Sequence, residues 1–258
     1  MKIIVLMKQV ANKDAVLRVG ADEKWIDEST ISYQTNESDG YGLEEALRLK
    51  ESKGDGEVIV CTLGAQSAKT VLKDALARGA DRAIHVVTDD ANKLSPYQIA
   101  KAIADAIRDE NADLVFTGLQ SDDASYGQTG VILAELLGIP HATIVIEIDR
   151  ASLSDSLRVK RELESGWYQW FAYQLPALLT IQSGISQIRY ASLKGIMTAK
   201  KKEIKDVVPA VESFAGAQKI EKVYLPLKLK QTQMLGNGDV KAGAVELVEK
   251  LKTEVRVI

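Results

Sequence analysis

The sequence predicts an α/β fold built on a mostly parallel open sheet with helices on both faces. Short apolar runs alternate with amphipathic helical patterns from residue 2 to residue 148, and this alternation indicates βαβ units. The runs are apolar at almost every position, which is typical of strands buried on both faces. After Asp149 the pattern changes to two strand-like segments around Gly166, which predict an antiparallel hairpin at the edge of the sheet.

The first 51 residues predict a strand, a small hairpin, a loop and a helix. Residues 2–7 form an apolar run that indicates a buried central strand. Within residues 14–27, two short alternating pieces are separated by turn residues, so we expect a hairpin there. A polar loop over residues 35–40 then leads into an amphipathic helix over residues 43–51, with its apolar side chains on one face.

Two further strand and helix pairs follow. Residues 57–63 and 82–87 are apolar runs that predict strands, and the pattern over residues 68–78 between them predicts a helix. Ser95 followed by Pro96 is typical of a helix N-cap with proline at the first helical position. The isoleucines behind this proline recur at i+4 spacing, so the helix presents one apolar face.

The central part of the chain predicts one more βα unit and then the hairpin. Residues 113–117 and 142–148 indicate strands on either side of a helix that ends at Leu137. Residues 156–163 and 167–173 indicate the two arms of the hairpin, and a last apolar strand follows over residues 176–181. Four aromatic side chains of the second arm form an unusual cluster, which we expect to pack in the core or at an interface: Trp167, Tyr168, Trp170 and Phe171.

The boundary between two parts of the chain is predicted after Gly184. The pattern predicts an α/β domain over residues 1–184 and an extended C-terminal arm within residues 185–258. Residues 206–240 show no sustained period, and an amphipathic helix is predicted over residues 242–252. A run of this length without regular structure usually lies on something else. We therefore expect an arm that wraps a partner subunit, with a disordered tail ending in a helix as the alternative.

Composition excludes several classes of function. The net charge of −3 argues against nucleic acid as the main partner. One cysteine, Cys61, excludes an internal disulfide and a multi-cysteine metal or iron–sulfur site. His85 and His141 lie within or beside apolar runs, so structural roles are expected for both. No targeting segment and no apolar stretch of roughly 20 residues is visible, so we expect a cytoplasmic protein without direct membrane insertion.

The loop over residues 117–129 is the strongest candidate for a binding site. Ligands of open parallel sheets bind beyond the carboxyl ends of strands, and a helix N-terminus attracts phosphate. Gly127 and Gly130 allow the backbone to approach a ligand closely, and Asp122 and Asp123 suit a ribose hydroxyl or a helix N-cap. Neither a Walker lysine nor the dinucleotide glycine spacing is present. These residues alone leave open both a nucleotide site and an ordinary βα loop.

The chain resembles, nearly from end to end, the β (small) subunit of electron-transfer flavoproteins. The segment over residues 159–177 corresponds to the signature stretch of that family. The residues that carry the resemblance are Ile3 to Lys8, Asn36 with Leu43 to Glu51, Ala80 to Arg82, Val159 to Glu164, Leu175 to Ala177 and Arg189 to Lys194.

The resemblance implies an electron carrier subunit rather than an enzyme. Its domain would have the adenine-nucleotide-hydrolase-like fold and would bind AMP, while an α subunit in the heterodimer would hold most of the FAD. The complex would accept electrons from flavin-containing dehydrogenases and pass them to a membrane quinone oxidoreductase. Carried over position by position, the AMP contacts would be Leu6, Asn36, Glu37, Ser38, Asp39, Leu63, Thr117, Gly118, Gln120, Ser121, Asp122, Ser125, Tyr126, Gly127, Gln128 and Thr129.

The resemblance also implies a docking surface for the dehydrogenase. The family's recognition loop corresponds to residues 190–197, and Leu193 corresponds to its anchoring leucine. The side chains expected to face the dehydrogenase are Tyr190, Leu193, Ile196 and Met197.

Three alternatives remain at this stage. Bifurcating members of the family bind a second FAD in place of AMP, but Leu119 replaces their characteristic arginine and Tyr126 is bulky, which favours AMP. A related ATP-using enzyme needs a glycine- and serine-rich loop after the first strand, where this chain has Lys8 to Asn12. The third alternative is a purely structural subunit with an empty site. The signature stretch also departs from the family at Ser165 and Trp167 to Trp170, which leaves the local partner surface open.

Overall fold

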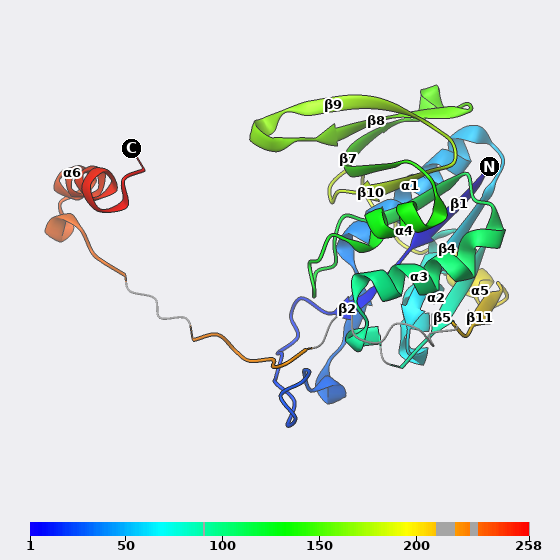
Figure 1. Cartoon of the computed structure of the whole chain (residues 1–258), viewed down its shortest axis with the longest axis horizontal. Coiled ribbons are helices and arrows are strands. Elements are labelled where there is room, and N and C mark those ends of the chain that lie inside the picture. Colours follow the sequence, from blue (N-terminus) through cyan, green and yellow to red (C-terminus); the bar gives the residue numbers. More distant parts are fainter. Residues whose placement is uncertain (90, 210–219, 228–231, 258) are drawn as a thin grey trace. The chain divides into compact units, whose positions relative to one another are not determined.

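The computed structural model describes residues 1–89, 91–209, 220–227 and 232–257. The chain divides into two units, Met1–Lys222 and Val223–Ile258. Figure 1 follows the chain through both. The first unit holds the sheet and its covering helices. In the second unit, helix α6 (Val240–Lys250) begins where the Asp239 carboxylate accepts from the N–H groups of the first helical turn. Part of the segment predicted to be irregular, residues 206–240, lies outside the described residues.

The predicted fold class is confirmed by the main sheet of the first unit. Its strand order is β11-β5-β4-β1-β6-β10-β7-β8-β9, with every pair from β11 to β7 parallel and the last two pairs antiparallel. The strands are β1 (Lys2–Leu6), β4 (Glu57–Gly64), β5 (Arg82–Val87), β6 (Leu114–Gly118), β7 (His141–Asp149), β8 (Ser156–Glu162), β9 (Tyr168–Gln174), β10 (Ala177–Ile181) and β11 (Ile204–Val207).

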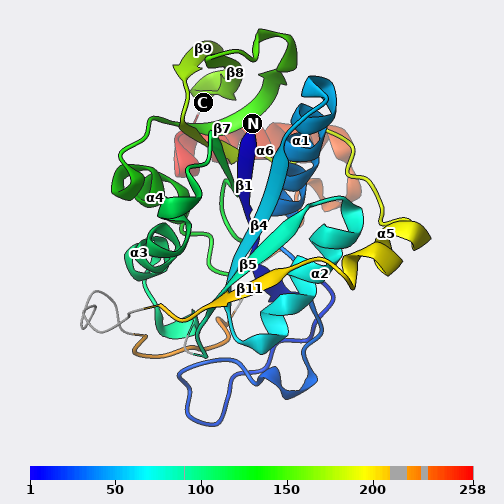
Figure 2. The same cartoon turned by 90° about the vertical axis from the view of Figure 1, so that its right-hand side faces the viewer.

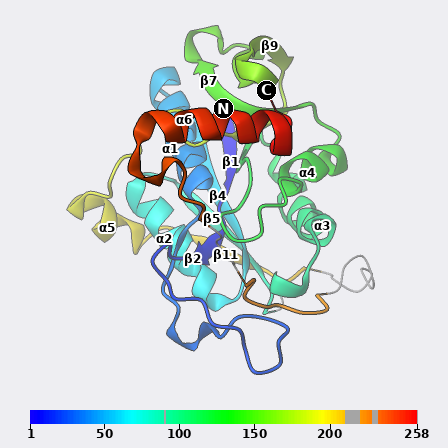
Figure 3. The same cartoon turned by 90° about the vertical axis from the view of Figure 1, so that its left-hand side faces the viewer.

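Helices cover both faces of this sheet, as Figures 2 and 3 show from opposite sides. Alternate side chains of one strand supply both cores, since Ile3 and Val5 of β1 face one set of helices while Ile4 and Leu6 face the other. One face carries α1 (Glu37–Lys53), α2 (Lys69–Arg78) and α5 (Leu193–Ala199), and the other carries α3 (Pro96–Ile107) and α4 (Thr129–Leu137). The two cores explain why the strand segments are apolar at nearly every position.

The predicted start of α3 is confirmed in atomic detail. The Ser95 hydroxyl accepts from the backbone N–H of Gln98, and the Gln98 side chain accepts from the backbone N–H of Ser95. This reciprocal pair is a capping box, with Pro96 at the first helical position. The local sequence therefore fixes where this helix begins.

Two predictions for the first 51 residues are wrong in position. Helix α1 begins at Glu37 rather than near Leu43, because polar residues of its first turn are buried and bonded to other segments. Residues 14–27 form only an isolated bridge between Val19 and Ile26. The antiparallel pair of this region lies outside them, between β2 (Gln9–Ala11) and β3 (Tyr33–Thr35). A hairpin signal between residues 14 and 27 therefore marks the tip of a longer excursion.

Two strands from late in the chain take positions that local patterns did not predict. Strand β10 inserts between β6 and β7, and all five of its residues are buried. Strand β11 pairs with β5 at the edge of the sheet, although the residues after Gly184 read as an extended segment. The compact unit thus continues beyond residue 184, to Lys222.

The aromatic cluster of β9 is not part of the core. Trp167 and Tyr168 are 72% and 53% exposed, and the Trp170 ring is covered partly by the Arg158 guanidinium at 4.5 Å from the ring centroid. The expectation of core packing is wrong for these residues, because Tyr168 and Trp170 lie on an exposed face of the edge strand β9 and Trp167 lies in the exposed turn before it. An interface role stays a prediction. Among the described helices, none combines the length and the apolar character that crossing a membrane requires.

Candidate functional site

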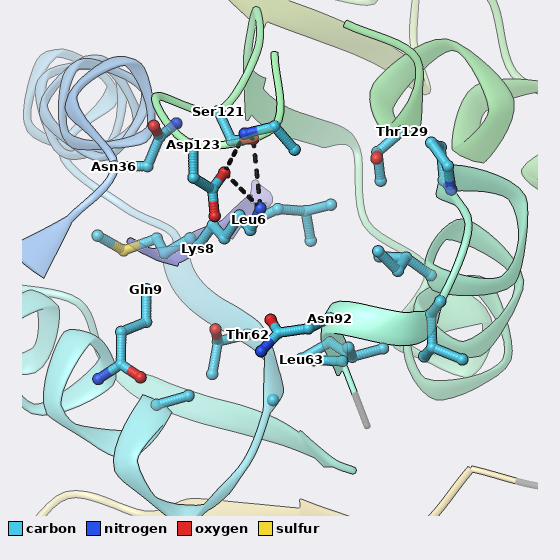
Figure 4. Close-up of a pocket in the computed structure, with 18 of the residues that line it drawn as sticks. Leu6, Lys8, Gln9, Asn36, Thr62, Leu63, Asn92, Ser121, Asp123 and Thr129 are labelled. Carbon is cyan, nitrogen blue, oxygen red and sulfur yellow. Dashed lines mark hydrogen bonds and ion pairs between the residues drawn. The ribbon is translucent and has the colours of Figure 1, made fainter. Parts of the chain in front are cut away.

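A pocket lined by apolar and polar side chains lies at the carboxyl ends of β1, β4 and β6. The chain proceeds from β1 to β4 and β5 on one side and then returns to β6 on the other side of β1. The space between β1 and β6 is therefore the switch point of the sheet, where open α/β folds bind ligands. The pocket has a volume of about 420 Å³, which falls within the range of roughly 300–1,000 Å³ that is typical of small-molecule sites. Figure 4 shows the side chains that line it.

The N-terminus of α4 forms one end of the pocket. Helix α4 begins at Thr129, its N-cap Gln128 makes no side-chain capping bond, and its first turn carries no acidic side chain. The backbone N–H groups of that turn have no partner inside the helix, and the helix dipole is positive there. A methyl group at Gly130 would lie 2.6 Å from Thr117 Oγ1, so the helix start rests directly on the strand ends. This geometry suits an anionic group.

The loop before α4 turns through two left-handed positions. Ser125 has a φ of 52° and Gly127 has a φ of 62°, a region that glycine adopts without cost and other residues rarely enter. The Ser125 hydroxyl donates to the Ser121 carbonyl at 3.1 Å, which supports the first of these positions. The turn aims the backbone of the loop back toward the pocket.

The Asp39 carboxylate joins the ends of the two strands that flank the switch point. It accepts from the backbone N–H of Lys8 after β1 at 2.7 Å and from the N–H of Gly118 at the end of β6 at 2.8 Å. Burial raises the pKa of Asp39 to about 6, although both backbone hydrogen bonds oppose that rise. The carboxylate therefore holds the pocket floor together while lying in an environment that disfavours its charge.

The raised pKa predicts how stability depends on pH. Between pH 4 and pH 6 the folded state keeps a proton on Asp39 that the unfolded state has lost, so this group's contribution to stability falls as the pH rises. A rise from 3.8 to about 6 corresponds to about 3 kcal/mol. The asparagine of Asp39→Asn does not titrate, so the wild type alone loses this stability as the pH rises. Between pH 4 and pH 7 we expect the difference in unfolding free energy between Asp39→Asn and the wild type to shift by about 2–3 kcal/mol in favour of Asp39→Asn. Urea unfolding of both proteins at each pH measures it, and a constant difference would contradict it.

Asn36 and Ser38 bind the loop that precedes α4 to the start of α1. Asn36 Nδ2 and Ser38 Oγ both donate to the Gln120 carbonyl, at 3.0 and 2.9 Å, and Asn36 Oδ1 accepts from the N–H of Asp122. The Asp122 carboxylate in turn accepts from the N–H of Glu37 at 3.3 Å, so it caps α1 rather than α4. The buried polar residues of the first α1 turn thus shape the loop.

Lys8 brings a positive charge to the pocket wall. Its Nζ lies 2.6 Å from Asp123 Oδ1 and 3.3 Å from Ser121 Oγ, as Figure 4 shows. Burial raises the pKa of Asp123, but the charge of Lys8 and the hydrogen bonds around the carboxylate outweigh it, and the net pKa is lowered. Lys8 therefore neutralises an acidic side chain that would otherwise repel an anionic ligand from this loop.

Most of the residues predicted to contact the nucleotide do line this pocket. Four of them do not: Glu37, Ser38, Asp122 and Ser125 serve the loop and the start of α1 instead. The predicted residues in the wall are Leu6, Asn36, Asp39, Leu63, Thr117, Gly118, Gln120, Ser121, Tyr126, Gly127, Gln128 and Thr129.

Several wall residues were not singled out from the sequence. Lys8 and Gln9 lie two and three residues beyond the end of β1, and this position near a strand's carboxyl end was the signal that could have found them. Thr62 is a hydroxyl inside an apolar run. Trp25 lies in the segment between β2 and β3, and Asn92 lies in the segment between β5 and α3. Both side chains donate to Glu28 Oε1, at 2.8 and 2.9 Å. Only the fold brings these segments to the pocket.

A second candidate surface is the short helix α5. Tyr190, Leu193 and Met197 are 95%, 85% and 64% exposed, and Ile196 is 45% exposed. Leu193 is therefore an exposed apolar residue, while its docking role stays a prediction. Around it stand four exposed lysines: Lys194, Lys200, Lys201 and Lys205.

The chain holds α5 firmly from both sides. Before the helix, the Arg189 guanidinium forms salt bridges with Glu44 and Glu51 of α1. After it, Lys202 Nζ donates to the carbonyls of Leu76 and Ala80 at the end of α2. The exposed apolar side chains of α5 are thus presented on a fixed support, which a specific docking surface requires.

Comparisons with known proteins agree on one family. Residues 24–212 match the model of the electron transfer flavoprotein domain. The chain is 34% identical to the electron transfer flavoprotein subunit beta of Methylophilus methylotrophus over 98% of this chain and 99% of that protein. It is 35% identical to the mitochondrial subunit beta of Oryza sativa subsp. japonica over the full length of both chains. It is 34% identical to the subunit beta of Homo sapiens over 81% of this chain and 82% of that protein.

Proposed function

Because the chain belongs to the electron transfer flavoprotein β-subunit family, we propose that it works as one half of a heterodimeric electron carrier. Its partner is the α subunit, which holds most of the FAD. The complex takes electrons from flavin-containing dehydrogenases and delivers them to a membrane quinone oxidoreductase. In this function the chain binds a nucleotide, associates with the α subunit and docks the dehydrogenase, and it carries out no reaction on a substrate of its own.

The pocket at the β1 and β6 strand ends is the observation that carries this proposal, and AMP is its occupant. The phosphate lies at the α4 N-terminus, where the N–H groups of the first turn and the positive end of the dipole meet it. Neutral donors from Gln128 and Thr129 add to them. The nucleoside extends toward the apolar wall made by Leu6, Leu63 and Ile99.

The size of the pocket favours a mononucleotide over a second FAD. FAD consists of AMP joined to a flavin mononucleotide, so it needs more than twice the space. The pocket volume of about 420 Å³ is near the lower end of the usual range. Leu119 and Tyr126, which differ from the bifurcating pattern, both lie in the wall. Because AMP binds only the folded state, it stabilises the chain by mass action, which makes its role structural.

Nucleotide released from the purified complex tests the proposal directly. We expect denaturation of the αβ complex to release one AMP and one FAD per heterodimer, identified by mass spectrometry and quantified by absorbance after chromatography. Two FAD per heterodimer would assign the chain to the bifurcating group instead. A complex that carries no flavin and accepts no electrons from a dehydrogenase would overturn the carrier function as a whole.

The second unit contributes to the heterodimer in this proposal. Helix α6 carries four exposed large apolar side chains, Val240, Val245, Leu247 and Val248, which find no cover within the described part of this unit. We propose that the arm lays this helix against the α subunit. Burial of one such side chain is worth about 1.5–3 kcal/mol, so a few of them suffice to hold the arm in place.

A further inference from the structure

The wall of the pocket contains a buried hydroxyl group that has no hydrogen-bond partner. Thr62 lies near the carboxyl end of β4 and is 1% exposed. Five buried side-chain atoms in the described part of the chain lack a partner, and Thr62 Oγ1 is the one among them that belongs to this pocket. Buried hydroxyls are almost always hydrogen-bonded, because an unpaired one loses its bonds to water without replacement. An orphan hydroxyl in a binding pocket therefore indicates a partner that comes with the ligand.

The neighbours of Thr62 do not share this property. Gln9 Nε2 donates to the Ser67 carbonyl and to Thr70 Oγ1, both at 2.9 Å. Asn92 Nδ2 is engaged with Glu28. Figure 4 shows Thr62 between Gln9 and Asn92, across the pocket from Thr129. Among the buried side-chain atoms on this side of the pocket, the Thr62 hydroxyl is thus the group left to bond a ligand.

We propose that the Thr62 hydroxyl hydrogen-bonds the base of the bound nucleotide and so helps to select it. This inference rests on the proposed nucleotide site. With the phosphate at the α4 N-terminus, an extended mononucleotide places its base toward the opposite side, where Thr62 lies. A hydroxyl can donate to a ring nitrogen or accept from an exocyclic amino group, and adenine presents both on adjacent atoms.

The proposal predicts two effects of Thr62→Val that have opposite signs. Valine has nearly the shape of threonine, so packing is kept while the hydroxyl is lost. Loss of one neutral hydrogen bond to the ligand weakens AMP binding about threefold to tenfold. In the nucleotide-free protein, removal of the orphan group relieves its desolvation cost and raises the Tm by about 2–4 °C. If Thr62 only packed the pocket wall, Thr62→Val would lower the Tm of the nucleotide-free protein and leave its affinity for AMP unchanged.

The experiment uses the αβ complex stripped of nucleotide by reversible urea treatment. Calorimetric titration with AMP gives the Kd, and thermal scans without AMP give the Tm. Thr62→Ser keeps the hydroxyl and should bind AMP like the wild type. Thr180→Val is the matched control for stability, because Thr180 is buried and its hydroxyl accepts from the N–H of Ile144 at 3.2 Å. It should lower the Tm, in contrast to Thr62→Val.

A second ligand tests the contact with the base. Ribose 5-phosphate lacks the base, so wild type and Thr62→Val should bind it equally. Equal AMP affinity in both proteins, a lowered Tm in nucleotide-free Thr62→Val, or an equal loss of affinity for ribose 5-phosphate would each overturn the role of Thr62. Failure of the wild type to bind AMP at all would instead overturn the nucleotide site itself, so the two failures are distinguishable.

Discussion

Gly118→Ala is expected to abolish retention of the nucleotide and to destabilise the chain by at least about 2–3 kcal/mol. A methyl group at this position would collide with Ser38 Oγ and Asp39 Oδ1 and would lie 3.0 Å from the backbone nitrogen of Asp39. Overpacking of this kind costs about 1–3 kcal/mol. The hydrogen bond from the Gly118 N–H to Asp39 is lost when the two segments move apart, which adds about 1 kcal/mol.

The loss of nucleotide follows from where the displaced atoms lie. Asp39 ties β6 to the end of β1, and Ser38 holds the Gln120 carbonyl of the loop. Movement of either one shifts the loop that leads to α4 and disperses the N–H groups that meet the phosphate. Gly42→Ala is the matched control. Gly42 lies in α1, and a methyl group there would meet side chains of the neighbouring strands at 3.7 Å, an ordinary contact distance. Nucleotide content after purification and urea unfolding measure both variants, and an AMP-loaded Gly118→Ala would refute this account of the pocket.

Leu193→Ala is expected to reduce electron transfer from the dehydrogenase by about tenfold to a hundredfold. The Leu193 side chain is 85% exposed, and filling a small apolar pocket on a partner with it contributes about 1.5–3 kcal/mol. The truncation should leave FAD content and association with the α subunit unchanged, because α5 is held through Arg189 and Lys202 rather than through Leu193. The measurement is kcat/KM for reduction of the complex by its dehydrogenase.

The control for this experiment is another exposed apolar residue. Val208 is 82% exposed and lies just beyond β11, so Val208→Ala removes a similar group away from α5. The surrounding lysines should make the encounter rate fall with ionic strength in both variants. Dissociation of the subunits or loss of flavin in Leu193→Ala would show that the leucine packs against the α subunit rather than against the dehydrogenase.

The sequence by itself determined most strands of the main sheet and the helices α2, α3 and α4. Short continuous apolar runs such as residues 2–7 and 57–63 are typical of strands covered on both sides. Ser95 with Pro96 set a helix start through local hydrogen bonds. The βα loop at residues 117–129 was also identifiable, because its place after a strand and before a helix depends only on neighbouring residues. Such features are encoded within a few residues of where they act.

The tertiary structure alone decided which distant segments meet. Strand β10 lies between β6 and β7, and β11 pairs with β5, although neither pairing leaves a local pattern. Helix α1 begins at Glu37 because Asn36, Ser38 and Asp39 bond to residues about 80 positions away. The orphan state of Thr62 depends on every atom around it. Long-range hydrogen bonds and the burial of single polar groups leave no periodic pattern in the sequence. The hydrogen-bonding state of the pocket residues can therefore be determined only from the folded chain.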